Sequence, residues 1–235
     1  MLDKTARDLK QAFLGQAHTI RAIERSLAMV RHGSPDHVDI TTTPAADAPD
    51  VIVPAVSVVI PLFNQGHYLH EAVDSVVAAS ACPALTVEIV IVDDHSTDGS
   101  LGVARSVLAA HPWLPITLVA RAANAGLPAA RNTGFARARG TYVFALDADN
   151  VLYPNGLAAL ARHLDDAPDD VIAAYGLLER FDERGSLGLT SHLPWDVDLL
   201  VHGAFIDAMA MFRRSAWLEL GGYADADGIY GWDPK

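Results

Sequence analysis

The chain has 235 residues, 51% of them hydrophobic, and a formal net charge of −12 with a pI of about 5.1. This composition excludes a chain that is disordered throughout, and the length suits one sizeable α/β domain with an extension. A protein that neutralises many phosphates needs a basic face, so no nucleic-acid partner is expected.

The N-terminal part of the chain divides into a predicted helix and a predicted linker. Residues 1–32 are expected to form an amphipathic helix, because apolar side chains from Leu9 to Leu27 recur at helical spacing among charged ones. This helix either docks or oligomerises the chain, or packs on its own domain. Residues 33–54 are rich in Pro, Asp, Thr and Ala, which is typical of a linker. Residues 55–235 then form the main domain.

From Val56 onward, apolar runs alternate with amphipathic segments. Such alternation predicts an α/β fold with a Rossmann-like, doubly wound and mainly parallel sheet. Strands are predicted near residues 56–60, 86–92, 115–120 and 141–146, and helices near residues 69–80, 101–110 and 127–139. In sheets of this kind, ligands bind beyond the carboxyl ends of the strands, so the residues that follow each strand are candidates for function.

The last of these strands is followed by two aspartates with one small residue between them. If the chain stays extended there, the side chains of Asp147 and Asp149 point the same way, and a cation between them relieves their repulsion. Hard oxygen ligands suit Mg²⁺ or Mn²⁺, which keep positions open for substrate phosphates. A solvated Asp-Asn turn is the alternative for the same residues.

Two further sets of polar residues lie after the second and third strands. Asp93 and Asp94 end a buried strand, where adjacent acids cost electrostatic energy, and a carboxylate there suits a base N–H or a ribose hydroxyl. Arg131 lies about one turn inside the next helix, as a cation either for a phosphate or site acid or for an exposed surface acid. Gly134 costs a helix about 1 kcal/mol relative to alanine, which indicates that another backbone or a ligand comes close.

The C-terminal residues predict a strand at residues 208–212 and a short helix at residues 214–220, ended by a glycine pair. Asp225, Asp227 and Asp233 follow among Gly, Tyr and Trp residues. This composition suits sugar binding, and an acidic surface loop is the alternative for the first two acids.

Five motifs, PLFN, VDDHSTDGS, NAGLPAARNTG, ALDADN and FRRSAWLELGGY, occur in this order and resemble those of family 2 glycosyltransferases with the GT-A fold. The resemblance covers residues 56–233, and its specificity lies in the ordered set. It implies a GT-A fold and a metal-dependent, inverting transfer of a sugar from a nucleotide-diphosphate sugar, with UDP-sugars as candidates. The acceptor would be a hydroxyl of a glycan, a lipid or a small molecule.

The resemblance also implies roles by position. The residues that it places at the donor nucleotide are Pro61, Phe63, Asn64, Asp93 or Asp94, Arg131 and Asp147. Asp149 would be the firmer metal ligand, with Asp147 near the ribose and the metal. Asp233 stands where relatives carry the first acid of a motif that supplies the general base, but Pro234 departs from that motif, so the base stays open. Because the chain stops there, a protein lacking its C-terminal part is expected.

Two other functions remain open. The domain could bind a nucleotide sugar, or act as a scaffold, without turnover. A nucleotidyltransferase is the second alternative, although PLFNQGHY lacks the Gly-rich basic loop of such enzymes. Product analysis separates the two reactions, because sugar transfer releases a nucleoside diphosphate and nucleotidyl transfer releases pyrophosphate.

The compartment follows from three observations. One cysteine, Cys82, cannot form an internal disulfide, which favours a reducing compartment. The N-terminus lacks the apolar stretch of a signal peptide, and residues 51–63 are too short to span a bilayer. We therefore expect no transmembrane segment and a cytoplasmic location, with peripheral attachment to a membrane left open.

Overall fold

The computed structural model describes residues 38–47, 53–81, 85–182, 184–191, 193–200 and 206–223. The predicted helix at residues 1–32 lies outside these ranges, and so do Cys82 and Asp233. The division of the chain into a helix, a linker and a domain therefore stays a prediction.

A central sheet of seven strands organises the described part of the chain, in the order β1-β4-β3-β2-β5-β9-β6. The inner strands β4, β3, β2 and β5 are parallel, whereas β1 and β9 run antiparallel to their neighbours. The predicted doubly wound, mainly parallel sheet is therefore confirmed. Its strands are β1 (Val38–Thr42), β2 (Val56–Leu62), β3 (Val87–Asp93), β4 (Ile116–Arg121), β5 (Tyr142–Ala145), β6 (Ala173–Tyr175) and β9 (Ala210–Arg213).

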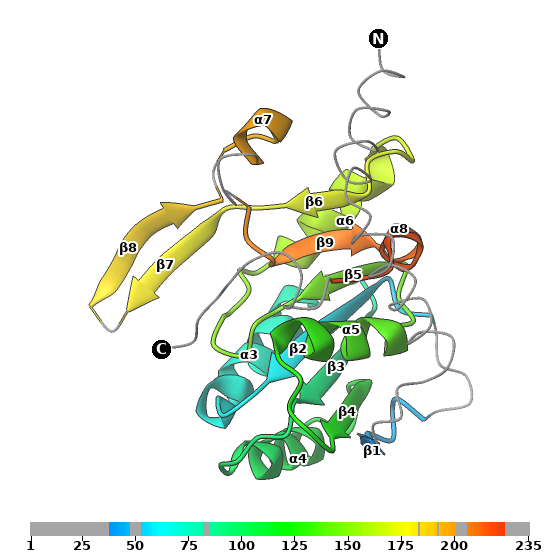
Figure 1. The fold of residues 1–235 in the computed structure, drawn as a ribbon, viewed down its shortest axis with the longest axis vertical. Coiled ribbons are helices and arrows are strands. Elements are labelled where there is room, and N and C mark those ends of the chain that lie inside the picture. Colours follow the sequence, from blue (N-terminus) through cyan, green and yellow to red (C-terminus); the bar gives the residue numbers. More distant parts are fainter. Residues whose placement is uncertain are drawn as a thin grey trace.

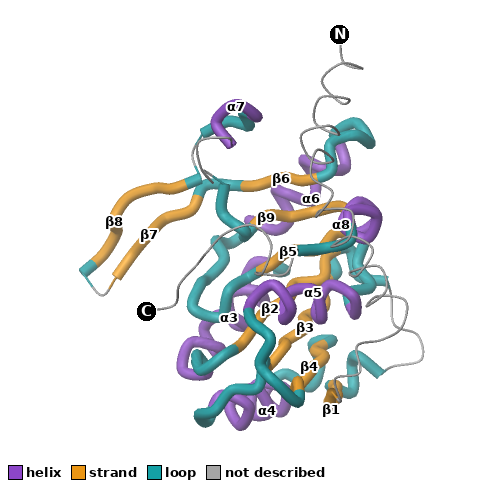
Figure 2. The backbone as a smooth tube through the Cα atoms, in the orientation of Figure 1, coloured by secondary structure: helices purple, strands orange, loops and turns teal. Residues whose placement is uncertain are grey.

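Helices cover both faces of this sheet (Figures 1 and 2). Alternate side chains of a strand point to opposite faces, so Val58 and Ile60 of β2 join one apolar cluster and Val59 joins the other. The first cluster includes side chains of α3 (Gly66–Ala79), α4 (Ser100–Ala110) and α6 (Gly156–Asp166). The second includes side chains of α5 (Leu127–Arg137) and α8 (Arg214–Leu220).

The continuous apolar runs of β2 and β3 are explained by burial on both faces, because all seven residues of each strand are buried. Helix α5 packs very closely on these strands at Gly134. A Cβ atom added to Gly134 would lie 2.3 Å from Cγ1 of Val59 and 3.2 Å from Cγ2 of Val92. The close approach predicted at this glycine therefore exists, and it is made by strand side chains rather than by a backbone or a ligand.

The structure differs from the sequence-based linker at residues 38–42. These residues form β1, which pairs antiparallel with β4 along the edge of the sheet. The adjoining Thr43 is buried, and its hydroxyl donates to the carbonyl of Leu114 at 2.7 Å. An edge strand contacts only one neighbour and its side chains stay largely exposed, which explains why its composition resembles that of a linker.

A hairpin of β7 (Leu178–Asp182) and β8 (Gly185–Thr190) extends away from the central sheet, and the one-turn helix α7 (Val197–Leu200) follows it (Figure 1). The sequence reasoning did not predict this hairpin. Phe181, Leu187 and Leu189 on it are each more than half exposed. Within the described ranges, no helix has both the length and the apolarity needed to cross a membrane.

Candidate functional site

The strand order reverses beside β2, because β3 and β4 follow on one side of it and β5 lies on the other. In open α/β sheets, the crevice at such a reversal, outside the carboxyl ends of the strands, is where ligands bind. The loops after β2, β3 and β5 meet there, and they carry the acids and the amide that the sequence singles out. The topology therefore brings these residues to one edge of the sheet.

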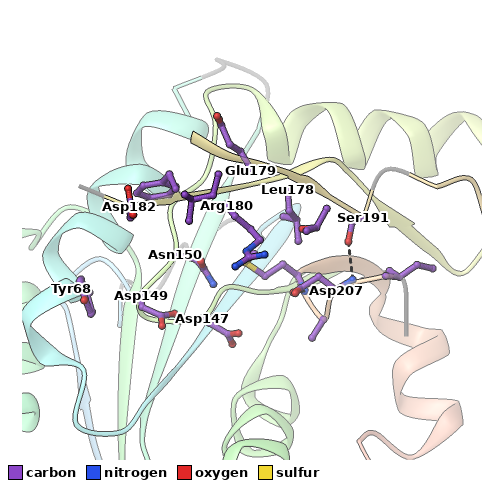
Figure 3. Close-up of a pocket in the computed structure, with 16 residues that line it drawn as sticks. Tyr68, Asp147, Asp149, Asn150, Leu178, Glu179, Arg180, Asp182, Ser191 and Asp207 are labelled. Atoms are coloured by element: carbon purple, nitrogen blue, oxygen red, sulfur yellow. Dashed lines mark hydrogen bonds between the residues drawn. The ribbon is translucent and has the colours of Figure 1, made fainter. Parts of the chain in front are cut away.

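Asp147 and Asp149 follow β5 and line one cavity. The chain does not stay extended between them, because the Asn150 amide donates to the Asp147 carbonyl at 3.0 Å and closes a turn. The condition of an extended segment is therefore not met, and the turn that the sequence offered as the alternative is present, although both carboxylates line the cavity (Figure 3). Asp149 accepts a hydrogen bond from the side-chain amide of Gln65 at 3.0 Å, which ties the loop after β5 to the loop after β2.

Arg131 is held against Asp147. The Nη2 atom of Arg131 lies 2.6 Å from Oδ1 of Asp147, and the arginine is 8% exposed. Its guanidinium carbon lies 5.5 Å from the centre of the Tyr223 ring, while its Nε–H is buried with no hydrogen-bond partner among the described residues. Of the two sequence interpretations of Arg131, the structure shows the one in which it pairs with a site acid.

Asp93 and Asp94 are both 2% exposed, but their surroundings differ. The carboxylate of Asp94 lies 2.8 Å from Nη1 of Arg121 and accepts from the backbone amides of Ala125 and Gly126. Asp94 therefore holds the loop after β4 in place. Among the residues that the structure describes, Asp93 accepts only from the amide of Ser96, and its Oδ1 atom is buried without a partner there.

The loop after β2 is fastened to the loop after β3 by Asn64. This residue adopts a left-handed φ of 55°, its amide N–H donates to Ser96 Oγ at 3.1 Å, and its Oδ1 accepts from the amide of Thr97 at 2.9 Å. Pro61 is buried within β2, whereas Phe63 is 44% exposed at the loop. The structure thus places Asn64 as a connection between two loops and leaves Phe63 free to contact a ligand.

The cavity beside Asp147 and Asp149 measures about 1130 Å³, and its far wall consists of the β7–β8 hairpin and residues 206–209. Its lining is rich in acids, with Glu179, Asp182 and Asp207 in addition to the two aspartates of the turn. Figure 3 shows the guanidinium of Arg180 pointing from β7 into this cavity.

Several residues of this cavity escaped the sequence reasoning, among them Gln65, Tyr68, Arg180 and Asp207. Gln65 and Asp149 are 84 positions apart, so no local spacing connects them. Arg180 and Asp207 come from a hairpin and a loop without a clear hydrophobic period. Only Gln65 had a signal, because it directly follows the PLFN motif.

The donor set allows a test of the predicted metal. Among the described residues, no group of three or more His, Cys, Asp or Glu side chains is placed to hold a metal ion. Mg²⁺ is often held by one or two carboxylates together with substrate phosphates, and it keeps several positions for water. Asp147 and Asp149 therefore fit a Mg²⁺ or Mn²⁺ ion that phosphate oxygens complete, and they do not fit a cage built from protein alone.

Comparison with known proteins adds three findings. The sequence model of Glycosyl transferase family 2 matches residues 57–221. The poly(ribitol-phosphate) β-N-acetylglucosaminyltransferase TarP of Staphylococcus aureus is 34% identical over 125 residues, which is 52% of this chain and 37% of TarP. A mannosyltransferase of Pyrobaculum calidifontis, solved with GDP-mannose and Mn²⁺, superimposes with a TM-score of 0.56 at 23% identity, covering 96% of this chain and 60% of that one.

A second solved structure, S. aureus TarS residues 1–349 with UDP, superimposes with a TM-score of 0.54 at 21% identity, covering 70% of this chain and 48% of TarS. At these identities, both structures show a shared fold alone. The chain spans less than two thirds of the length of the first curated relatives that it matches.

Proposed function

The chain belongs to Glycosyl transferase family 2, and from that premise we propose that it transfers a sugar from a nucleotide-diphosphate sugar to a hydroxyl acceptor with the help of a divalent metal. The observation that carries the proposal is the joint placement of Asp147 and Asp149 in one cavity at the strand ends, where the strand order reverses. Two structures with this fold contain a nucleotide or a nucleotide sugar, one of them with Mn²⁺.

Asp93 is our candidate for the base of the donor. Its Oδ1 atom is buried and has no donor within the described ranges, so a base N–H would supply a hydrogen bond to it. Asp94 is less suited, because its carboxylate already binds Arg121 and two backbone amides. The sequence left the choice between these acids open, and their hydrogen bonds favour Asp93. Pro61, Phe63 and Asn64 are proposed to flank the nucleotide from the neighbouring loop.

Cations and acids at the mouth of the cavity have complementary roles in this proposal. Asp149 and Asp147 would hold Mg²⁺ or Mn²⁺, which offsets the negative charge that builds up on a leaving diphosphate. Arg131 fixes the direction of the Asp147 carboxylate through their short ion pair. Arg180, whose guanidinium reaches the cavity from β7, is placed to bind phosphate oxygens.

Inversion at the anomeric carbon requires a base that takes the proton of the acceptor hydroxyl from the opposite face of the sugar. Asp233 stays the proposed base by its motif position, and it lies outside the described residues. Asp207 is a described acid of the same cavity wall, but its Oδ1 accepts from the amide of Met209. A cytoplasmic location and a docking role for residues 1–32 belong to the same proposal.

The decisive experiment combines Asp149→Ala with removal of the metal. Calorimetry with UDP and GDP, each with Mn²⁺ or with EDTA, should show nucleotide binding that depends on Mn²⁺. Asp149→Ala should weaken that binding by at least about tenfold, which corresponds to ~1.4 kcal/mol. A donor-hydrolysis assay with UDP-sugars and GDP-sugars on the same proteins then distinguishes turnover from binding without turnover. A parallel assay with a nucleoside triphosphate and a sugar 1-phosphate would release pyrophosphate only if the protein is a nucleotidyltransferase.

Asp169→Asn is the matched control, because this exposed aspartate lies after α6 and away from the cavity. It should leave nucleotide binding unchanged. Equal Mn²⁺ dependence in Asp149→Ala and Asp169→Asn would remove Asp149 as a metal ligand, and nucleotide binding that is unchanged by EDTA in the wild type would remove the metal role from the proposal.

A further inference from the structure

A second cavity of about 450 Å³ adjoins the acidic one, and it is apolar. Its floor consists of Phe144 from β5 and Met209, and one wall is formed by α6 through Ala159 and Leu160. This volume lies within the range of about 300–1000 Å³ that small-molecule sites occupy. A hollow of this kind on the surface of a domain indicates a ligand rather than a packing defect.

The rim of this cavity is apolar as well as exposed. Tyr153 is 59% exposed, Leu177 60% and Phe181 55%, and all three line the opening. Exposed apolar side chains gathered around a hollow mark binding sites, whereas singly scattered ones are ordinary. Two glycines of the lining, Gly156 and Gly176, have no atom within 4 Å of an added Cβ position, so the hollow extends beside the backbone.

The two cavities adjoin each other and share a wall. Asn150, Leu178, Glu179, Phe181 and Met209 line both of them, and Asn150 directly follows the metal-site candidate Asp149. Figure 3 shows Glu179 and Arg180 pointing to opposite sides of β7. The carboxylate of Glu179 accepts a hydrogen bond from the Tyr153 hydroxyl, and this bond raises the pKa of Tyr153. The hydrogen bond joins the loop after β5 to the hairpin at the boundary between a polar and an apolar cavity.

From this juxtaposition we propose that the apolar cavity binds the apolar part of the acceptor, an alkyl chain or an aromatic ring attached to the group whose hydroxyl reaches the acidic cavity. The proposal rests on the proposed glycosyl transfer and names its acceptor class as an amphiphile. An acidic cavity repels an anionic acceptor, whereas a neutral polyol with an apolar tail matches both surfaces.

The test measures binding of the neutral fluorescent probe N-phenyl-1-naphthylamine to the full 235-residue chain. The wild type should bind the probe. Ala159→Trp, which fills the cavity from α6, should weaken binding by at least about tenfold. The matched control is His163→Trp, one turn further along α6 and outside the lining, which should bind as the wild type does.

A second variant keeps the proposal testable if the tryptophan disturbs folding. Leu177→Asp places a charge on an exposed rim position without changing the packing of the core, and it should lower probe affinity by about tenfold. Competition then identifies the ligand chemistry. Octyl β-D-glucoside or phenyl β-D-glucoside should displace the probe, and their ranking separates an alkyl from an aromatic preference, whereas methyl β-D-glucoside should not displace it.

UDP binding with Mn²⁺, measured on the same variants, distinguishes a failure of the proposed glycosyl transfer from a failure of the apolar acceptor site. Ala159→Trp and Leu177→Asp should retain nucleotide binding, because neither residue lines the acidic cavity. Absence of nucleotide binding in the wild type would count against the proposed function. Probe binding that is absent, or that is equal in Ala159→Trp and His163→Trp, would overturn the apolar site, and so would displacement by the methyl glucoside.

Discussion

Strand β3 carries a buried acid near each of its ends, and the two acids have different surroundings. Near the beginning, Glu88 is 3% exposed and accepts hydrogen bonds from the Ser57 hydroxyl at 2.6 Å, the Arg139 amide at 2.7 Å and the Arg139 Nε–H at 2.8 Å. At the end, Asp93 is 2% exposed, and the one hydrogen bond that it accepts from a described residue comes from the amide of Ser96, at 3.2 Å.

Two tyrosines repeat this contrast. Tyr142, at the beginning of β5, donates its hydroxyl to Asp165 at 2.6 Å. The hydroxyl of Tyr223, beside Arg131, is buried and has no partner in the described part of the chain. Folding normally satisfies buried polar groups, so an edge that leaves several unpaired indicates that a ligand completes it. Within the described ranges, Arg214 and Trp217 on α8 also carry such atoms, and nothing in the structure explains them.

The largest effect on the free energy of unfolding is expected from Glu88, because protein groups supply the hydrogen bonds to its carboxylate. Glu88→Gln removes the charge that binds Arg139 and places an amide N–H₂ among hydrogen-bond donors. The free energy of unfolding should fall by about 3 kcal/mol, because the buried carboxylate loses hydrogen bonds and gains an unpaired donor, whereas the ion pair contributes little since the Arg139 side chain is 43% exposed. Urea denaturation followed by circular dichroism measures the change.

Glu71→Gln, at an exposed position of α3, is the matched control and should change the free energy of unfolding by no more than about 0.5 kcal/mol. Folded Glu88→Gln should bind UDP as the wild type does. If Glu88→Gln and Glu71→Gln were equally stable, the hydrogen bonds around Glu88 would not stabilise the fold. The proposed difference between the two ends of β3 would then be wrong.

The next effect separates the adjacent acids Asp93 and Asp94. Asp94→Asn should lower the free energy of unfolding by about 2 kcal/mol, because it breaks an ion pair with the buried Arg121. Asp93→Asn should change it by no more than about 1 kcal/mol, since one oxygen has no partner to lose. UDP affinity should instead fall about tenfold to hundredfold in Asp93→Asn.

Chemical denaturation and calorimetry on both variants give the two measurements. A strongly destabilised Asp93→Asn with unchanged UDP affinity would assign Asp93 to the structure of the loop rather than to the donor. Asp147 and Asp149 alone would then remain as acids that bind the donor.

The same contrast explains how much of the fold could be predicted from the sequence. Strands β2 and β3 are buried on both faces and lie in parallel pairs, so their apolar runs identify them without any long-range information. Strand β1 contacts one neighbour, and the β7–β8 hairpin is largely exposed, so neither needs an apolar pattern. Strands with few buried side chains have no marked hydrophobic pattern, so the sequence alone does not identify them.

The site was predictable to the extent that topology alone places it. The carboxyl ends of parallel strands lie at one edge of any doubly wound sheet, so the sequence alone predicts that Asp93 and Asp147 lie at the same edge. The division of work between Asp93 and Asp94 depends on backbone amides of the loop after β4, and the contact between Gln65 and Asp149 depends on the turn after β5. Such contacts follow from loop conformation, which residue spacing does not encode.

The smallest effect is expected from the two tyrosines. Tyr142→Phe should lower the free energy of unfolding by about 1 kcal/mol, because the hydrogen bond to Asp165 is lost. Tyr223→Phe should leave it unchanged or raise it by up to about 1 kcal/mol, because the phenol has no partner to lose. Thermal denaturation at neutral pH of these variants and of the wild type gives both values.

Alkaline pH supplies the second half of this test. Burial raises the pKa of Tyr142 and of Tyr223 above the ordinary value of 10.0, and the hydrogen bond to Asp165 adds to the effect at Tyr142. A raised pKa means that each tyrosine's contribution to stability is fully present below pH 10 and is lost as pH rises through the pKa of the folded state. Each Phe variant should therefore lose less stability than the wild type above pH 10. If Tyr223→Phe were destabilising at neutral pH, the Tyr223 hydroxyl of the wild type would have a hydrogen-bond partner in solution. The buried polar groups at the site would then be as fully hydrogen-bonded as those at the opposite edge of the sheet.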